Sequence, residues 1–151
     1  MSGRQWKNLA VIKTKDIENV GIIGAGLMGH GIAHAFAIHG YKVNIFDADI
    51  TGLRTVPDRI YQNLQVVLKL KKVKKSEIEK CIGNIDLCDD LGSVCENVDF
   101  IIEAIKENLD AKVTLFEELE QGIDSNVIVS SNTSAISITR LSGGLKHKQR
   151  S

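Results

Sequence analysis

The sequence has little of several features that would indicate particular partners. Its 19 basic and 19 acidic residues cancel, so the chain offers no general electrostatic field for nucleic acid or an anionic membrane. Aromatic residues make up only 5% of the chain, too few to predict a surface on which bases stack. No stretch approaches the roughly 20 consecutive apolar residues of a membrane-spanning helix. The composition therefore predicts neither a nucleic-acid nor a membrane partner.

The cysteines are few and odd in number. Cys81, Cys88 and Cys95 show no C-x-x-C spacing, so they predict neither a disulfide framework nor a metal site. We interpret them as reduced thiols and expect a cytoplasmic protein. Residues 1–17, which we treat as an N-terminal extension, lack the apolar block of a secretory signal and the Arg/Ser richness of a transit peptide. We therefore expect no targeting role for them.

Proline is almost absent, and no proline-rich linker, internal repeat or low-complexity tract divides the chain. The single proline, Pro57, lies within a helical pattern, where it predicts that a helix begins or is kinked. With 151 residues, 43% of them hydrophobic, the chain can bury the core of one domain. We expect that domain over residues 18–151.

The most informative pattern present is the glycine-rich segment GAGLMG between an apolar strand and a helix. Gly24 permits a tight turn out of the strand, Gly26 lets a pyrophosphate approach the backbone, and Gly29 lets the helix pack closely on the sheet. The free N–H groups of the helix N-terminus then face the phosphates. This pattern predicts a dinucleotide-binding turn that includes Leu27 and Met28. The alternative is a glycine-rich turn that binds nothing.

An acidic residue completes this unit. A second apolar strand, predicted at 42–46, ends in Asp47. Asp47 follows Gly24 at the distance at which a carboxylate accepts hydrogen bonds from the ribose hydroxyls of adenosine. Because the strands, helix, glycines and acid all occur together, we favour dinucleotide binding over an unoccupied turn.

The rest of the chain alternates helical and strand patterns. Short apolar runs predict strands at 85–87, 98–103 and 127–129, and the second of these is nearly continuous, as is typical of a buried parallel strand. A capping-box pattern predicts a short helix starting at Ser76, and a longer helix is predicted over 107–120. The expected fold class is α/β, a Rossmann-type doubly wound parallel sheet in one domain.

Polar turns are predicted after several strands, and in such sheets ligands bind at the carboxyl ends of the strands. These turns are 24–29, 103–107 and 130–134. The serine, asparagine and threonine of the last turn are also common helix caps. On the residues alone both interpretations of this turn stay open.

Two further patterns suggest ligands but have simpler explanations. His30 and His34 lie one helical turn apart, which is the spacing of metal ligands, but no third ligand is evident. We interpret them as a pair on the helix surface and expect no metal. The lysine-rich run 69–75 suggests a phosphate site, whereas lysines at a helix end also complement the helix dipole. We favour the second explanation.

Three segments together resemble the L-3-hydroxyacyl-CoA dehydrogenase family. They are GAGLMGHGIA at 24–33, IEAIKEN at 102–108 followed by Lys112, and SNTS at 131–134. Their order and spacing match over roughly 18–145. The resemblance implies a Rossmann domain that binds NAD, oxidation of the 3-hydroxyl of an acyl-CoA, and a place in the β-oxidation of fatty acids.

The resemblance also implies roles for individual residues. The residue that matches Asp47 holds the adenosine ribose. The residues that lie along the cofactor match Ala104, Glu107 and Lys112. Those that stand near the nicotinamide and the reacting oxygen match Asn132 and Ser134, and we expect Ser134 to donate a hydrogen bond to the substrate oxygen.

The family's catalytic histidine lies after the SNTS turn, in a His-Phe-Phe-Asn-Pro type motif, and a partner glutamate lies further on. The sequence given ends at Ser151, before such a motif, and His147 lies in a basic stretch of different pattern. The resemblance implies that this histidine, the glutamate and a helical C-terminal domain that completes the acyl pocket and a homodimer lie outside these residues. We expect the 151 residues alone to bind NAD without turning over an acyl-CoA.

Two other functions stay open on the sequence. A related dehydrogenase of sugar acids or short hydroxy acids would share this cofactor half. Alternatively, the chain is an NAD(H)-binding module without turnover. Reduction of acetoacetyl-CoA by NADH, with and without a supplied C-terminal domain, distinguishes these functions.

Overall fold

The structure is a computed structural model that describes residues 17–69, 74–137 and 141. Residues 1–16 of the expected extension, most of the lysine-rich run and His147 lie outside the described residues. Within the described residues, no helix combines the length and the apolar character needed to cross a membrane.

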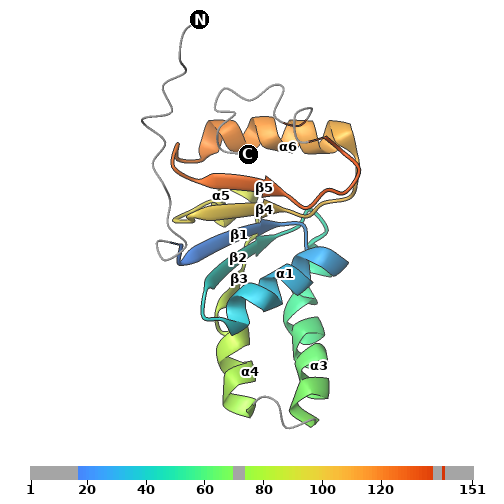
Figure 1. The fold of residues 1–151 in the computed structure, drawn as a ribbon, viewed down its shortest axis with the longest axis vertical. Helices are drawn as coiled ribbons and strands as arrows, with labels where there is room; N and C mark the ends of the chain where they lie inside the picture. The colour runs from blue at the N-terminus through green and yellow to red at the C-terminus, as the bar shows by residue number, and fades with distance from the viewer. Residues whose placement is uncertain (1–16, 70–73, 138–140, 142–151) are drawn as a thin grey trace, which may run out of the picture.

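In the described part of the chain, a parallel sheet organises the molecule, with five strands in the order β3-β2-β1-β4-β5 (Figure 1). The strands are β1 (Asn19–Ile23), β2 (Lys42–Phe46), β3 (Ile85–Leu87), β4 (Phe100–Glu103) and β5 (Ile128–Ser131). The chain runs from β1 outward to one edge, returns to pair β4 with β1, and then runs to the other edge. This topology confirms the expected doubly wound α/β fold.

Helices cover both faces of the sheet (Figure 1). On one face lie α1 (Leu27–Ile38), α3 (Val56–Lys69) and α4 (Lys75–Ile82), together with the short α2 (Ile50–Arg54). On the other face lie α5 (Leu91–Val94) and α6 (Leu109–Gly122). The result is a three-layer molecule with an apolar cluster on each side of the sheet.

The alternation of side chains along β1 explains the two clusters. Val20 and Ile22 pack into the cluster under α1, whereas Ile23 packs into the cluster under α6. Successive residues of a strand point to opposite faces, and both faces of this central strand are covered. A β1 sequence that is apolar at nearly every position therefore follows from its place in the sheet.

Three helix starts can be compared with the sequence prediction, and the two that differ from it are set by local hydrogen bonds. Pro57 lies in the first turn of α3, as predicted. The predicted start at Ser76 is wrong, because α4 begins one residue earlier and the N–H of Lys74 donates to Glu77 Oε2 at 2.6 Å. The start predicted at 107 is also wrong, because the Asn108 side chain caps α6 by accepting from the N–H of Ala111 at 3.0 Å.

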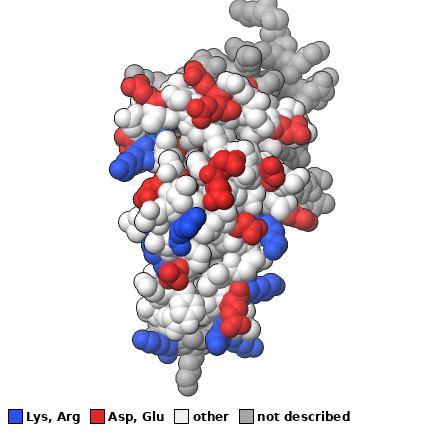
Figure 2. Space-filling model, turned by 180° about the vertical axis from the view of Figure 1, so that it is seen from behind, with Lys and Arg blue, Asp and Glu red and all other residues white. Residues whose placement is uncertain are grey.

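Charge is unevenly distributed over the surface. Basic side chains concentrate at the end of the molecule that α3 and α4 form, whereas acidic side chains predominate over the rest of the face in Figure 2. Lys69, Lys74 and Lys75 are exposed at this end. Lys69 lies in the last turn of α3, where a positive charge complements the helix dipole.

The first turn of α1 approaches the glycine-rich turn very closely. A Cβ atom at Gly29 would lie 1.6 Å from the carbonyl oxygen of Gly24, whereas one at Gly31, on the exposed side of the same helix, would meet nothing within 4 Å. Gly29 is therefore required by packing, and Gly31 is not.

We expect Gly29→Ala to lower the free energy of unfolding by at least about 1–3 kcal/mol, because the helix must move away from the backbone that it contacts. Gly31→Ala should instead raise it by about 0.5–1 kcal/mol, because alanine is the better helix former. Urea unfolding followed by circular dichroism measures both changes. Equal effects of the two substitutions would contradict this account of α1 packing.

Candidate functional site

The predicted polar turns meet at one edge of the sheet, beyond the carboxyl ends of the strands. Hydrogen bonds continue the strand pairing one residue into each turn. They run from the N–H of Gly24 to Phe46 O at 2.8 Å, from Ala104 to Ile23 O at 2.7 Å and from Asn132 to Glu103 O at 2.7 Å. The turns after β1, β4 and β5 are thus held side by side, at the point where the strand order reverses and where such sheets bind ligands.

The glycine-rich turn has the geometry of a phosphate cradle. Gly24 has a φ of +107°, and a Cβ atom there would lie 2.5 Å from the Ala104 carbonyl oxygen, so both conformation and space require glycine. At Gly26, by contrast, a Cβ atom would meet nothing within 4 Å. The space in front of Gly26 is open and suits a group that approaches the backbone.

The start of α1 provides the matching charge. Gly26 is its N-cap, no side chain caps the helix, and no acidic residue lies in the first turn. Leu27 and Met28 are exposed, at 81% and 54% of their surfaces. Uncapped N–H groups and the positive end of the helix dipole favour an anion. The residues present therefore fit the pyrophosphate of a dinucleotide.

Asp47 lies at the end of β2, next to this cradle. Its Oδ2 accepts a hydrogen bond from the N–H of Ala25 at 2.6 Å, and its Oδ1 accepts from the N–H of Asp49 at 2.8 Å. Each carboxylate oxygen has two lone pairs, so Asp47 retains acceptor capacity for a pair of ribose hydroxyls. The side chain is half-buried, which fixes its direction while leaving it accessible.

Arg59, which is not among the predicted site residues, also holds the turn. From α3 its Nη2 donates to the carbonyl oxygens of Ala25, at 2.7 Å, and Gly52, at 3.1 Å. Ala25 therefore bonds to Asp47 through its N–H and to Arg59 through its C=O. The hydrogen bond joins residues 34 positions apart, so no local sequence pattern signals it.

The interpretation of His30 and His34 as a surface pair is wrong for His30. Its side chain is only 6% exposed, and its Nδ1 lies 2.8 Å from the carbonyl oxygen of Gly26, to which it donates.

Burial, and then the neighbouring His30 and His39, lower the pKa of His34. The described residues contain no cluster of three or more His, Cys, Asp or Glu side chains that could hold a metal ion.

A buried ion pair lies beneath the turn that follows β4. Lys112, on α6, places its Nζ 2.6 Å from Glu103 Oε1 and 2.8 Å from Glu103 Oε2. Both side chains are 0% exposed. This setting differs from the one that the resemblance implies, because the Lys112 ammonium faces Glu103 and has no exposed surface along which a cofactor would lie.

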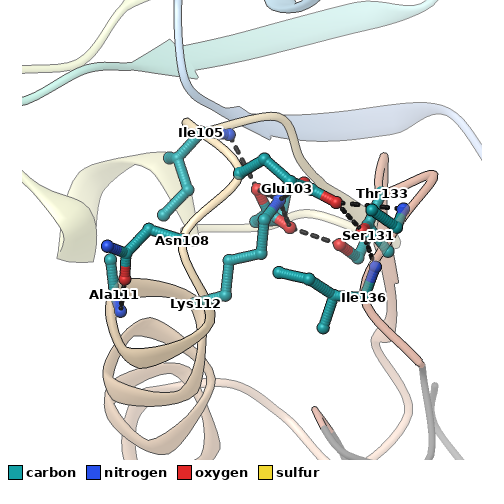
Figure 3. Close-up of polar contacts among 10 residues, drawn as sticks. Glu103, Ile105, Asn108, Ala111, Lys112, Ser131, Thr133 and Ile136 are labelled. Carbon is teal, nitrogen blue, oxygen red and sulfur yellow. Dashed lines mark hydrogen bonds and ion pairs between the residues drawn. The ribbon is translucent and has the colours of Figure 1, made fainter.

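The Glu103 carboxylate also binds the turns after β4 and β5 (Figure 3). Its Oε1 accepts from the N–H of Ile105 at 2.7 Å, and its Oε2 accepts from the hydroxyl of Ser131. A charged residue that directly ends an apolar strand was the available sequence signal for Glu103. Its side-chain partners Lys112 and Ser131 come from other elements, so no local sequence pattern predicts the role of Glu103 or of Ser131.

Glu107 joins the same two turns from the exposed side. Its Oε1 accepts from the hydroxyl of Thr133 and from the N–H of Ala135, the latter at 3.2 Å. Its Oε2 lies 3.3 Å from Lys112 Nζ. The hydrogen bond from Thr133, assisted by those from Ala135 and Lys112, lowers the pKa of Glu107.

The remaining predicted residues lie in these turns. Asn132 and Ser134 are exposed, and Ala104 is half-buried. Ser134 stands between Thr133 and Ala135, the two residues that bind Glu107. The structure thus brings the predicted site residues together along one edge, with the glycine turn and Asp47 at one side and the turn after β5 at the other.

Comparison with known proteins identifies close relatives. A family model described as the NAD binding domain of 3-hydroxyacyl-CoA dehydrogenase matches residues 19–151. The chain is 34% identical to the mitochondrial hydroxyacyl-coenzyme A dehydrogenase of Sus scrofa over 139 residues, which cover 89% of this chain and 44% of that protein. It is 31% identical to a 3-hydroxybutyryl-CoA dehydrogenase of Mycobacterium tuberculosis, covering 89% of this chain and 47% of that one.

The solved structures agree. The crystal structure of (S)-3-hydroxybutyryl-CoA dehydrogenase from Ralstonia eutropha matches with a TM-score of 0.85 at 32% identity, covering 89% of this chain and 47% of that one. The 3-hydroxybutyryl-CoA dehydrogenase from Escherichia coli matches with a TM-score of 0.84 at 30% identity, covering 89% of this chain and 28% of that one. The chain spans less than half the length of these relatives.

We expect Thr133→Val to raise the pKa of Glu107 towards its ordinary value, because the substitution removes the donor that most favours the ionised carboxylate. Thr114→Val, on the exposed side of α6, is the matched control and should leave that pKa unchanged. NMR titration of the Glu107 side-chain carboxyl carbon measures both.

The sign of the stability effect follows from the direction of this shift. The contribution of Glu107 to the free energy of unfolding is fully present above its ordinary pKa and is lost as the pH falls through its lowered pKa in the folded protein. Thr133→Val should reduce this acid-side dependence. An unchanged Glu107 titration in the variant would show that Thr133 is not its controlling partner.

Proposed function

We propose that this chain, which belongs to the family of 3-hydroxyacyl-CoA dehydrogenase NAD-binding domains, binds NAD at the carboxyl edge of its sheet and presents it to an acyl-CoA. The family match confirms the family and the cofactor that the sequence motifs indicate. The observation that supports the proposed binding mode is the open cradle at Gly26, at an uncapped helix start and beside Asp47.

The arrangement of the turns suggests a role for each part of the site. The glycine turn and the start of α1 hold the pyrophosphate, and Asp47 accepts hydrogen bonds from the adenosine ribose. Ala104, Asn132 and Ser134, in the turns after β4 and β5, would hold the nicotinamide half of the cofactor. When bound, NAD supplies the acceptor for the hydride from C3 of the substrate.

Ser134 is the residue that we assign to the reacting oxygen. It is exposed beside Asn132, and its hydroxyl can donate to the 3-oxygen of the acyl-CoA and orient it for transfer. Glu107 supports this turn from the exposed side through its contact with Thr133, and Lys112 supports it from the buried side through Glu103. We assign the proton acceptor to none of the described residues.

The activity of the whole protein is proposed from its relatives. We propose the oxidation of a 3-hydroxyacyl-CoA, of the 3-hydroxybutyryl-CoA type, in the β-oxidation of fatty acids, by a homodimeric enzyme. We also propose a reducing location such as the cytoplasm, supported by three free cysteines. Burial raises the pKa of Cys88 and of Cys95 to about 11, so both thiols stay protonated and poorly reactive near neutral pH.

Cofactor choice tests the role of Asp47. We expect NAD to bind at least about tenfold more tightly than NADP, a difference of about 1.4 kcal/mol, because the carboxylate accepts from the ribose hydroxyls and repels an additional phosphate. Asp47→Ser should narrow the preference, whereas Asp58→Ser, at an exposed position of α3, should not. Calorimetric titration with both cofactors measures this, and equal affinities in the wild type would disprove the assignment.

The cradle itself is tested at Gly26. We expect Gly26→Val to abolish NAD binding while the fold is retained, because the added side chain fills only the open space at the cradle. Gly31→Val introduces the same side chain into open space further along α1 and should preserve binding. Calorimetry gives the affinity and circular dichroism the fold. Unchanged affinity in a folded Gly26→Val protein would exclude this turn as the phosphate site.

A further inference from the structure

Glu103 has no part in the proposed contacts with NAD, yet it is one of only four buried polar or charged residues identified in the described part of the chain: His30, Asn84, Glu103 and Lys112. We propose that Glu103 is a positioning residue for the nicotinamide half of the site and acts by fixing the turn that presents Asn132 and Ser134. This inference rests on the proposed function and names a residue that governs one half of it.

The hydrogen bonding of the Glu103 carboxylate is saturated. Oε1 accepts from Ile105 N and Lys112 Nζ, and Oε2 accepts from Ser131 Oγ and again from Lys112 Nζ. A buried ion pair adds little net stability compared with apolar residues of the same volume. The number and direction of its contacts, which reach α6, the turn after β4 and the end of β5, are better explained by a need for precise geometry.

Glu103 fixes the entrance to the Ser134 turn through two separate groups. Its side chain accepts from the Ser131 hydroxyl, and its backbone carbonyl accepts from the N–H of Asn132 at 2.7 Å. The two residues that lead into the turn are therefore both held by one residue of β4. Movement of Glu103 would displace Asn132 and, after it, Ser134.

The exit from the turn is fixed through Lys112. Its Nζ bridges Glu103 to Glu107 Oε2, at 3.3 Å, and Glu107 Oε1 accepts from Thr133 and Ala135, on either side of Ser134. The contacts form a closed ring from Ser131 through Glu103, Lys112 and Glu107 back to Thr133. Figure 3 shows Glu103 and Lys112 beside Ser131 and Thr133. Ser134 is thus bracketed by groups that the ring holds.

The ring lies on one side of the site only. In the strand order, β2 with Asp47 and β5 with the Ser134 turn lie on opposite sides of β1. The adenosine half depends on the glycine turn and Asp47, which make no hydrogen bond to the side chains of the ring; backbone packing of Gly24 against Ala104 is what joins the two halves. Loss of the ring should therefore weaken contacts of the nicotinamide half far more than those of the adenosine half.

The test compares two probes that differ in this half. ADP contains the adenosine and the pyrophosphate, whereas NAD adds the nicotinamide riboside. We expect Glu103→Gln to lower the affinity for NAD by about tenfold or more, because it removes the charge that holds Lys112 and Ser131. The affinity for ADP, which lacks the nicotinamide half, should change by less than about twofold. Calorimetry gives both affinities, and the fluorescence of bound NADH reports the surroundings of the nicotinamide directly.

A second variant covers the outcome that Glu103→Gln fails to fold, since it leaves a buried ammonium with one acidic partner. Ser131→Ala removes a single hydroxyl from the ring and should shift the NAD-to-ADP affinity ratio in the same direction by a smaller factor. Ser130→Ala is its matched control, because the Ser130 hydroxyl faces the Ile101 carbonyl within the sheet. Glu118→Gln, on the exposed side of α6, is the control for Glu103→Gln.

The outcomes separate the inference from the function on which it rests. A lowered NAD-to-ADP ratio with altered NADH fluorescence in Ser131→Ala and in folded Glu103→Gln supports the positioning role. An unchanged NAD-to-ADP affinity ratio, whether both affinities fall equally or neither changes, overturns it and leaves Glu103 as a purely structural residue. A wild-type protein that binds ADP but not NAD overturns the proposed function as well.

Discussion

The contact between the Glu103 carboxylate and the Lys112 ammonium is the interaction on which the turns after β4 and β5 depend. It removes two charges from water, at a cost of several kcal/mol per ion that only close pairing and further hydrogen bonds offset. The structure meets that requirement with distances of 2.6 and 2.8 Å and with donors from Ile105 and Ser131. Because Glu103 ends β4 and Lys112 belongs to α6, one contact determines how the helix, the sheet and two turns fit together.

The two halves of the edge are built by opposite means. Around β1 the site is shaped by missing side chains: a Cβ atom would collide with backbone at Gly24 and Gly29 and would close the open space at Gly26. Around β4 and β5 it is shaped by charged side chains in mutual contact. Phosphates are recognised by backbone N–H groups and a helix dipole, which need close approach. A reacting carbon and its oxygen must be oriented by side chains in fixed positions, and other residues must hold those side chains in place.

These two means also explain what the sequence predicts. The glycine turn, Asp47 and the buried β4 were all predicted, because each depends on residues close together along the chain and on periodicity. The roles of Arg59 and Ser131 were not, because their partners are distant along the chain. The burial of His30 was not predicted either, because its ring turns back onto the Gly26 carbonyl at the start of its own helix. Helix starts shifted by one or two residues because single caps, such as Asn108, decide them.

The ring limits which substitutions its three charged residues can tolerate. Lys112 contacts both Glu103 and Glu107, so replacing one of these residues alone removes a charged partner from a residue that stays in place. A neutral residue at 103 leaves a buried ammonium, and a neutral residue at 112 leaves a buried carboxylate, and either is far more costly than replacing both. Energies of residues in such a network do not add. The turn that holds Asn132 and Ser134 is therefore constrained by residues of neighbouring elements that support it through hydrogen bonds and ion pairs.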